Sequence, residues 1–223
     1  MTAQYQPDHD FCYDILRGVA ALNQSRIVAN LANVLAKDPR SDLSIAFNHK
    51  QIGSKLWLRD TLFETYGGQH DHIWVLGGWY GVLSAILFDD PRFKIRRITS
   101  IDLDPGCAGV ARLLNREMSA EGRFIAKTAD MNDLDYGTRD ADAPSLIINT
   151  SCEHLPDVSR WLSRLPQGQA VLLQSNDYFA EPTHLSSVEN LAAFETQAGL
   201  SRVDFAGERP TKNYTRFMLI GGR

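Results

Sequence analysis

Three features are scarce in this sequence: cysteine, excess basic charge and long hydrophobic runs. The cysteines Cys12, Cys107 and Cys152 are widely separated and form no C-x-x-C pair, so neither a disulfide framework nor a zinc site is expected, and a reducing, cytoplasmic environment is predicted. The 23 Lys and Arg residues against 27 Asp and Glu residues give a formal net charge of -4, which argues against nucleic acid as a partner. No apolar run approaches the roughly 18 to 20 residues that cross a bilayer, and the start of the chain lacks the basic and apolar stretches of a signal peptide. We therefore expect neither membrane nor nucleic-acid binding.

The length and composition fit one large domain, or one domain with a helical appendage. The chain has 223 residues, of which 43% are hydrophobic, enough to bury a sizeable core. Apolar residues recur at helical intervals over 10–37 and predict one or two helices, with a break at 23–25. Another helix is expected over 54–66. Residues 1–69 are therefore predicted to form a helical lid on a second region, 70–223.

After Gly68 short apolar runs alternate with helical segments, which is typical of β-α-β units around a mostly parallel sheet. The last two strands are joined by a loop too short for a crossover helix, so they are expected to pair antiparallel. The seven predicted strands are 73–76, 97–101, 123–127, 145–148, 170–174, 201–205 and 214–220, with helices at 82–88, 108–117, 158–165 and 188–198.

A glycine-rich turn, Gly77-Gly78-Trp79-Tyr80-Gly81, follows the first predicted strand. Glycine lets the backbone turn tightly and approach a ligand, although the spacing fits neither the dinucleotide-binding pattern nor a P-loop. The second strand ends in Asp102, 21 residues after Gly81, about where an acidic residue binds the hydroxyls of a ribose held over the turn. Capping of the next helix is the alternative role, although Asp104-Pro105 suits that role better.

Polar residues also follow the later strands. Asp130 and Met131 come after the third strand, where a side-chain acceptor beside an apolar group suits an adenine ring; a plain Asx turn is the alternative. The carboxyl ends of the strands line the ligand crevice in an open α/β sheet. The segments Asn149–His154 and Gln174–Phe179 are therefore expected beside the reacting groups.

These motifs resemble those of the class I S-adenosylmethionine (SAM)-dependent methyltransferases over about residues 70–221. The resemblance rests on the order of elements, on the segments VLGGWYG, IDLD, ADM and NTSCEHL, and on the antiparallel final pair. It implies a doubly wound, Rossmann-like α/β sheet of order 3-2-1-4-5-7-6, with strand seven antiparallel. It implies SAM as the cofactor and assigns, by position, Gly77, Gly78 and Gly81 to its methionine part, Asp102 to the ribose and Asp130 to the adenine.

The departures from the family pattern concern the methionine arm. Trp79 stands where the family has glycine, so that Trp79 and Tyr80 either face the sulfonium, as a cation over an aromatic ring, or pack beneath the N-terminal helices. Leu76 stands where an acidic residue usually binds the methionine amine. Lys55 either neutralises the methionine carboxylate or lies on a solvated helix face.

Three functions fit these residues. The first is methyl transfer to a small-molecule amine or carboxylate that Asn149, Tyr178 and His154 hold beneath the lid, with catalysis by alignment and desolvation. The second is cyclisation of SAM as sole substrate, with release of methylthioadenosine and with Asn149, Asp177 or Tyr178 accepting the amine proton. The aromatic turn, the helical lid and the missing acid at Leu76 resemble the azetidine-2-carboxylate synthases. The third is SAM binding without catalysis.

Metal and subunit contacts are less defined by the sequence. No metal site is predicted, because His70-Asp71-His72 lacks a third ligand and is typical of a solvated loop. His154 is either a general base or a structural partner that closes its turn. Residues 1–69 either close as a lid or pair two subunits as a homodimer.

Overall fold

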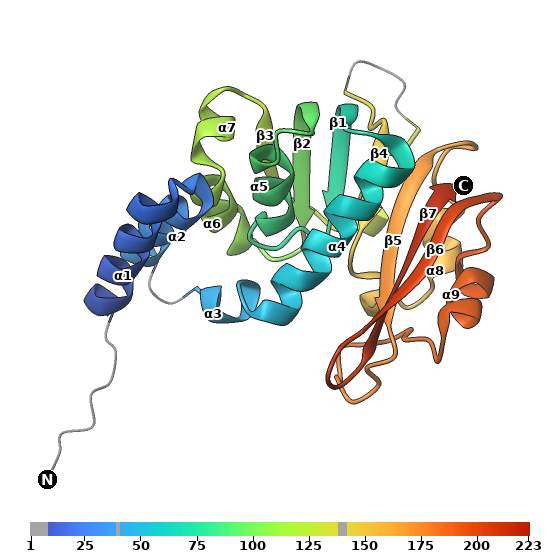
Figure 1. Cartoon of the computed structure of the whole chain (residues 1–223). Helices are drawn as coiled ribbons and strands as arrows, with labels where there is room; N and C mark the ends of the chain where they lie inside the picture. The colour runs from blue at the N-terminus through green and yellow to red at the C-terminus, as the bar shows by residue number, and fades with distance from the viewer. Residues whose placement is uncertain (1–8, 39–40, 138–141) are drawn as a thin grey trace, which may run out of the picture.

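The computed structural model describes residues 9–38, 41–137 and 142–223, in which helices cover both faces of a seven-stranded sheet (Figure 1). The strand order is β3-β2-β1-β4-β5-β7-β6, and β7 runs antiparallel to both β5 and β6. The predicted order and the antiparallel final strand are confirmed. The strands are β1 (Gln69–Leu76), β2 (Lys94–Asp102), β3 (Phe124–Thr128), β4 (Leu146–Asn149), β5 (Ala170–Asn176), β6 (Arg202–Pro210) and β7 (Thr215–Gly222).

The N-terminal region folds into helices whose ends follow from capping side chains. α1 (His9–Asn23) and α2 (Arg26–Lys37) are separated at Gln24, which has a φ of 56°, and the Ser25 hydroxyl caps α2, so the predicted break is confirmed. The short α3 (Leu43–Ala46) was not predicted. α4 (His49–Tyr66) begins earlier than the predicted Ser54, because the Asn48 side chain accepts hydrogen bonds from the first-turn amides of this helix.

The helices predicted over 158–165 and 188–198 are shorter in the structure, whereas the helix predicted over 82–88 extends one residue further, to Asp89. The predicted helix over 108–117 divides at Asn115, whose side-chain amide donates to the carbonyls of Gly81 and Ala111. The bond to the Gly81 carbonyl anchors the glycine-rich turn to the point where the predicted helix divides. The helices are α5 (Val82–Asp89), α6 (Cys107–Leu114), α7 (Arg116–Ala120), α8 (Val158–Leu162) and α9 (Leu191–Ala198), with 3-10 turns η1 (Met131–Asp133) and η2 (Cys152–His154).

Each face of the sheet carries its own apolar core. On one face Leu58 of α4 and Leu83 of α5 pack with alternate residues of the central strands, and on the other Trp161 of α8 and Phe194 of α9 do the same. β5 shows the alternation, since Leu172 belongs to the first core while its neighbours belong to the second. Burial on both faces explains the nearly continuous apolar runs of the central strands.

The segment His70-Asp71-His72 was wrongly expected to be a solvated loop. β1 begins at Gln69, and His70 and His72 are 9% and 2% exposed. The His72 ring shares a 2.8 Å hydrogen bond, Nε2 to Oγ1, with Thr99. These histidines are buried strand residues. Because their neighbours in the sequence are polar, the segment lacks the apolar pattern that predicts a strand.

The first 69 residues make two different kinds of contact. α2 packs against α5 and α6 through Val34 and its neighbours, while α4 lies on the sheet and contributes Leu58 and Leu62 to the main core. α1 packs on α2 and leaves Ile15 and Leu22 exposed (Figure 1). Within the described ranges, no helix has the length and apolarity needed to cross a bilayer.

Candidate functional site

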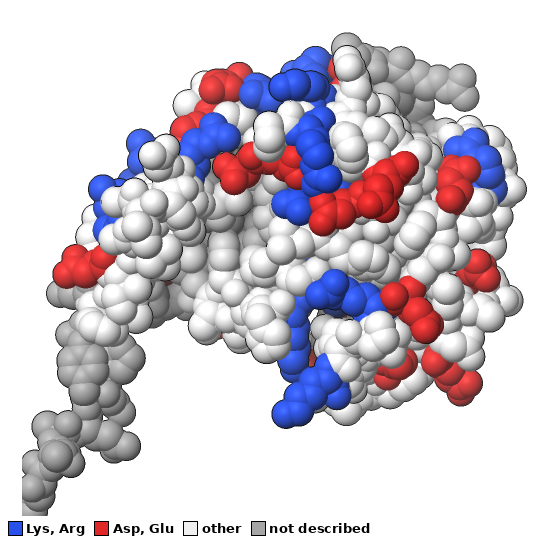
Figure 2. All heavy atoms as spheres, viewed as in Figure 1, with Lys and Arg blue, Asp and Glu red and all other residues white. Residues whose placement is uncertain are grey.

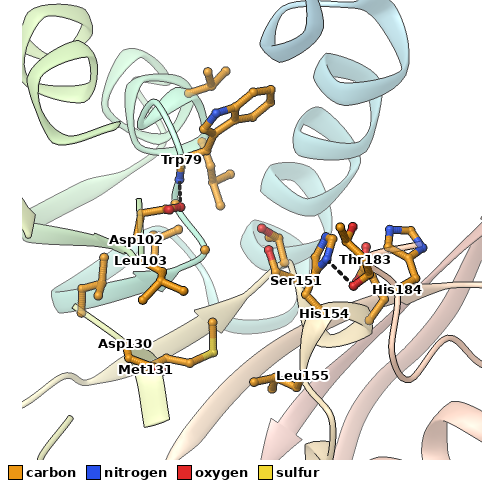
Figure 3. A pocket seen from close by; sticks show the side chains of 18 of the residues that line it. Trp79, Asp102, Leu103, Asp130, Met131, Ser151, His154, Leu155, Thr183 and His184 are labelled. Carbon is orange, nitrogen blue, oxygen red and sulfur yellow. Dashed lines mark hydrogen bonds between the residues drawn. The ribbon is translucent and has the colours of Figure 1, made fainter. Parts of the chain in front are cut away.

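A cavity of about 590 Å³ lies at the carboxyl ends of β1, β2, β3 and β4. In an open α/β sheet this edge is where ligands bind, and the volume lies within the range of small-molecule and cofactor sites. The cavity brings together most of the predicted binding residues (Figure 3). Its walls include Gly77, Gly78, Trp79, Asp102, Asp130, Met131, Lys55 and His154.

The glycine-rich turn needs its glycines for close packing. A side-chain carbon at Gly77 or Gly78 would overlap the hydroxyl of Ser151 or Ser100, respectively. Gly77 also has a φ of 61°, in the left-handed region. The backbone of the turn is therefore able to lie directly against the neighbouring strand ends, where the amides of Gly78 and Trp79 donate to the Ile101 carbonyl and the Asp102 carboxylate.

The Asp102 carboxylate is fixed by the main chain at the end of β2. Oδ2 accepts a 2.7 Å hydrogen bond from the amide of Trp79, and Oδ1 accepts one of 3.0 Å from the amide of Asp104. Each oxygen retains a second lone pair, and the side chain lines the cavity (Figure 3). The same residue thus holds the turn and presents acceptors to the cavity.

Asp130 and Met131 form the wall after β3. One oxygen of Asp130 accepts from the amide of Asn132 at 2.7 Å and caps η1, so the Asx-turn alternative is correct as far as this oxygen is concerned. The Met131 side chain lies along the cavity, with its sulfur 3.5 Å from Nδ2 of Asn149. A polar acceptor and an apolar side chain therefore stand together, as the sequence predicts.

The two aromatic residues of the turn have different surroundings. Trp79 lines the cavity, and its ring stacks on Tyr80 with centroids 4.9 Å apart. Tyr80 is 8% exposed, does not line this cavity, and accepts a hydrogen bond from the amide of Asp42 through its hydroxyl. Tyr80 ties the turn to the N-terminal helices. Trp79 has a φ of 46°, a conformation that explains the glycine usual at this position.

Lys55 projects from α4 to the cavity. Its Nζ donates to Oε1 of Gln51 at 2.8 Å, and among the described residues it makes no ion pair. Burial, and then the positive charge of Arg216, lower the pKa of Lys55 to about 8. Lys55 is half-buried, and an ammonium withdrawn from water without a carboxylate partner is costly, so this position favours an anionic group of a ligand.

A second cavity, of about 260 Å³, adjoins the first and shares its walls at Gln51, Glu153, His154 and Arg216. Tyr178 lines it and is 37% exposed, with its ring 5.7 Å from that of Tyr214. His154 lies between the two cavities.

The architecture matches solved structures of methyltransferases. The chain is similar to the N-methyltransferase NodS from Bradyrhizobium japonicum WM9, with 14% identity over 80% of this chain and 98% of that one and a TM-score of 0.59. It is also similar to geranyl diphosphate C-methyltransferase from Streptomyces coelicolor A3(2), with 12% identity over 75% and 76% of the two chains and a TM-score of 0.55. This chain has the class I SAM-dependent methyltransferase fold.

A possible exported protein from Bordetella parapertussis is similar over 99% of both chains, with 13% identity and a TM-score of 0.57. The N-terminal helices are therefore included in that likeness. The sequence matches no protein-family profile and no curated protein. Identities at this level establish the fold and leave the reaction to be argued from the site.

Two predicted catalytic residues of this methyltransferase fold lie outside both cavities. Asn149 is fully buried, and its Oδ1 accepts from the amide of Ser151 at 2.9 Å. Oδ1 of Asp177 accepts from the amide of Thr215 at 2.6 Å. Both residues shape the chain at strand ends, which is a common use of polar side chains at such turns.

The sequence analysis missed a buried ion pair in the shared wall. Oε1 of Glu153, which is 3% exposed, accepts from Nη1 of Arg216 at 2.9 Å and also from Nδ2 of Asn176. Arg216 is the only charged residue in the otherwise apolar strand β7. That isolated charge is the sequence signal that points to the site.

Proposed function

We propose that this protein binds SAM in the larger cavity and transfers its methyl group to a small-molecule acceptor in the adjoining one. The observation that carries the proposal is the convergence of four strand ends on one cavity, with Gly77, Gly78, Asp102, Asp130 and Met131 in its wall. The family resemblance assigns Gly77, Gly78, Asp102 and Asp130 to SAM; it also assigns Gly81, which does not line the cavity. The neighbouring residues, Met131 among them, offer the polar and apolar groups that the parts of SAM require.

Different cavity residues bind different parts of the cofactor. Asp102 accepts hydrogen bonds from the ribose hydroxyls with its free lone pairs, and Asp130 and Met131 bind the adenine amino group and ring. The Lys55 ammonium pairs with the methionine carboxylate, which supplies the anion that this half-buried cation lacks. The Trp79 ring borders the methionine arm. SAM supplies an electrophilic methyl group on a sulfonium.

The acceptor is small, because the adjoining cavity of about 260 Å³ lies slightly below the roughly 300 to 1,000 Å³ of ordinary ligand sites. Tyr178 and Arg216 line it and offer a hydroxyl and a cation, which suits an acceptor with a carboxylate as well as a nucleophile. On the face seen in Figure 2, acidic and basic side chains are interspersed. Among the ion pairs of the protein, Arg59 and Arg92 both pair with Asp60 and Asp90. This face does not present the extended basic surface that a nucleic-acid acceptor requires.

Methyl transfer in this site relies mainly on alignment. Attack on a sulfonium neutralises a charge, so holding the two reactants in line in a site shielded from water supplies most of the rate increase. Ile45, Gln51 and Lys55, from α3 and α4, line the cavity from the N-terminal side, which supports a lid role for these helices. His154 lies where the two cavities meet and positions the acceptor.

Intramolecular cyclisation of SAM is the second candidate, favoured by one observation. Leu76 is fully buried at the position where the family usually has an acid, so no carboxylate at this point keeps the methionine amine protonated. The amine nitrogen then attacks the γ-carbon of the methionine arm and the bond from that carbon to sulfur breaks. Tyr178 or His154 accepts the proton of the ring nitrogen, and methylthioadenosine leaves. The third candidate is binding without turnover.

Incubation with SAM separates the candidates. Calorimetry should first show SAM binding; absence of heat would refute all three functions. S-adenosylhomocysteine formed only when a panel of small amines and carboxylic acids is added supports methyl transfer. Methylthioadenosine formed from SAM alone, above the rate without protein, supports cyclisation, and neither product supports a binding role.

Two further assignments belong to this proposal. The cysteines Cys12, Cys107 and Cys152 are free thiols, as a reducing cytoplasm requires, and fractionation of the native cells tests that location.

The exposed apolar residues of α1, including Ile15 and Leu22, support a homodimer. Light scattering on the purified protein measures its mass, and a monomer at working concentration contradicts the dimer.

A further inference from the structure

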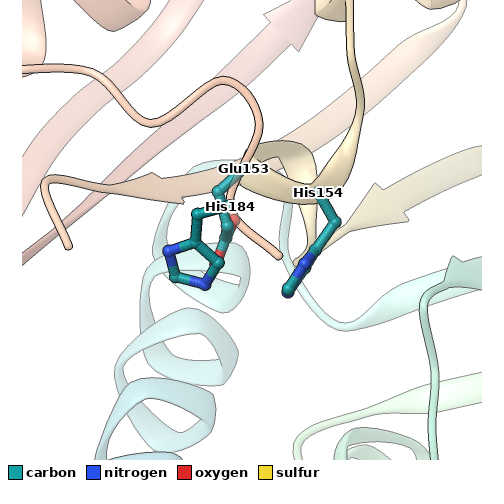
Figure 4. Close-up of side chains that lie close together, drawn as sticks. All are labelled: Glu153, His154 and His184. Atoms are coloured by element: carbon teal, nitrogen blue, oxygen red, sulfur yellow. The ribbon is translucent and has the colours of Figure 1, made fainter. Parts of the chain in front are cut away.

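Three potential ligand groups meet where the two cavities join: Glu153 and His154 of η2, and His184 in the segment after β5 (Figure 4). One nitrogen of each imidazole and one oxygen of the carboxylate all lie within 4.8 Å of one another. The rings of His154 and His184 are in edge contact, with centroids 4.8 Å apart. Glu153 and His154 are neighbours in the sequence, but His184 lies 30 residues further along, so only the fold reveals the cluster.

Both imidazoles are oriented by backbone carbonyls. Nδ1 of His154 lies 3.0 Å from the carbonyl oxygen of Thr183 (Figure 3), and Nδ1 of His184 lies 2.8 Å from that of Tyr178. A carbonyl oxygen only accepts, so each Nδ1 carries the hydrogen and each neutral ring has its lone pair on Nε2. Histidines that bind metals have this same arrangement, in which the outer nitrogen donates to a carbonyl or carboxylate.

Glu153 supplies an unused acceptor. Its Oε1 is occupied by Arg216 and Asn176, but Oε2 is buried and has no hydrogen-bond partner among the described residues. Burial of a carboxylate oxygen without a partner is unfavourable, and a cation at this point removes the penalty. The side chain is 3% exposed, so the oxygen is held in place by its surroundings.

We infer that Oε2 of Glu153 and Nε2 of His154 and His184 form a binding site for a divalent transition-metal ion such as Zn²⁺. Two imidazoles and one carboxylate form a donor set used by catalytic zinc sites that keep one position open. Metal bonds of about 2.0 to 2.1 Å place tetrahedral ligands roughly 3.3 Å apart, so side-chain movement of about 1 Å closes the observed cluster. His154 is exposed and His184 is half-buried, so both rings can shift by this amount although their Nδ1 atoms bond to carbonyls.

The open position faces the cavities that share this wall. Arg216 adds a positive charge on the other side of Glu153, which weakens the affinity for the metal alone and favours an anionic or strongly donating fourth ligand. A carboxylate or amine of the acceptor meets that need. The metal site does not depend on SAM binding, so it stands or falls separately from the proposed function.

Calorimetric titration with Zn²⁺ tests the inference on the full-length protein after dialysis against a chelator. We expect one ion per chain, with affinity lowered at least tenfold in both His154→Gln and His184→Gln. His49→Gln, which removes an exposed histidine outside both cavities, should bind as the unaltered protein does. Mg²⁺, which prefers oxygen ligands, should bind far more weakly.

Several outcomes overturn the inference: no Zn²⁺ binding, binding that persists unchanged in either cavity variant, or equal binding of Mg²⁺ and Zn²⁺. Circular dichroism before each titration shows whether a variant is folded. Both cavity histidines lie outside the buried core. Nδ1 of His154 bonds to one carbonyl, and Nδ1 of His184 bonds to one carbonyl and lies 3.5 Å from the Ser187 hydroxyl, so their substitution should leave the fold intact. If Zn²⁺ binds but SAM does not, the metal site survives while the proposed function fails.

Discussion

The charge state of Lys55 should make ligand binding depend on pH in a defined direction. Its pKa is lowered to about 8, so the ammonium is present below pH 8 and is lost as the pH rises through that value. If the ammonium binds the methionine carboxylate, the competent fraction falls from about nine tenths at pH 7 to about one tenth at pH 9. The dissociation constant of S-adenosylhomocysteine should therefore rise about tenfold, which corresponds to about 1.4 kcal/mol.

Two comparisons isolate the lysine from other titrating groups. Methylthioadenosine lacks the carboxylate and amine, so its affinity should be nearly constant over the same range. The Lys55→Met variant should bind S-adenosylhomocysteine weakly at pH 7 and with little further loss at pH 9, and any remaining slope belongs to the amine of the ligand. Calorimetry at pH 7, 8 and 9 gives all the constants. Equal slopes for the unaltered protein and Lys55→Met would refute the role of the ammonium.

Three further predictions concern the turn and the second cavity. Asp102→Asn should weaken SAM binding by at least tenfold, as expected for loss of charged hydrogen bonds worth roughly 1.5 to 3 kcal/mol. Asp104 does not line the cavity, so Asp104→Asn is the control in the same calorimetric titration. Equal dissociation constants for Asp102→Asn and the unaltered protein would show that Asp102 does not bind SAM. Trp79→Gly should be more stable than Trp79→Ala by about 1 kcal/mol in chemical denaturation, because both lose the ring but only glycine relaxes at a φ of 46°; the opposite order would show that the turn is not strained. Tyr178→Phe should lower kcat more than it raises KM. Unchanged values of both constants would show that the Tyr178 hydroxyl takes no part in the reaction.

The fold could be predicted because its signals are local and repeated. Apolar runs with two-residue alternation or helical spacing mark most elements, and the short final loop is enough to predict the antiparallel pairing of β7. The errors occur where one side chain overrides the pattern. Asn48 starts α4 early, Asn115 divides a helix, and the buried His70 and His72 extend β1 through a polar segment.

The candidate site was predictable only in part, since position at a strand end does not decide where a side chain points. Asp102 and Asp130 reach the cavity, whereas Asn149 and Asp177 bond to nearby amides and lie outside both cavities. The same residue types serve both purposes. Arg216 reaches the shared wall from β7, through a register that the sequence does not specify.

Glu153 joins the parts of the second cavity that are distant in the sequence. Its carbonyl accepts from the amides of Leu185 and Ser186, while its carboxylate accepts from Arg216. One residue of η2 thereby holds the segment that carries His184 and one strand of the sheet. Removal of one member of a buried ion pair commonly costs about 3 to 5 kcal/mol. Substitution of Glu153 would therefore disturb the fold, the Arg216 guanidinium and the position of His184 at once. Substitution of His184 removes the Nε2 lone pair and the bond from Nδ1 to the Tyr178 carbonyl but leaves the buried pair of Glu153 and Arg216 in place. Its effects can therefore be assigned more directly to the chemistry of the site.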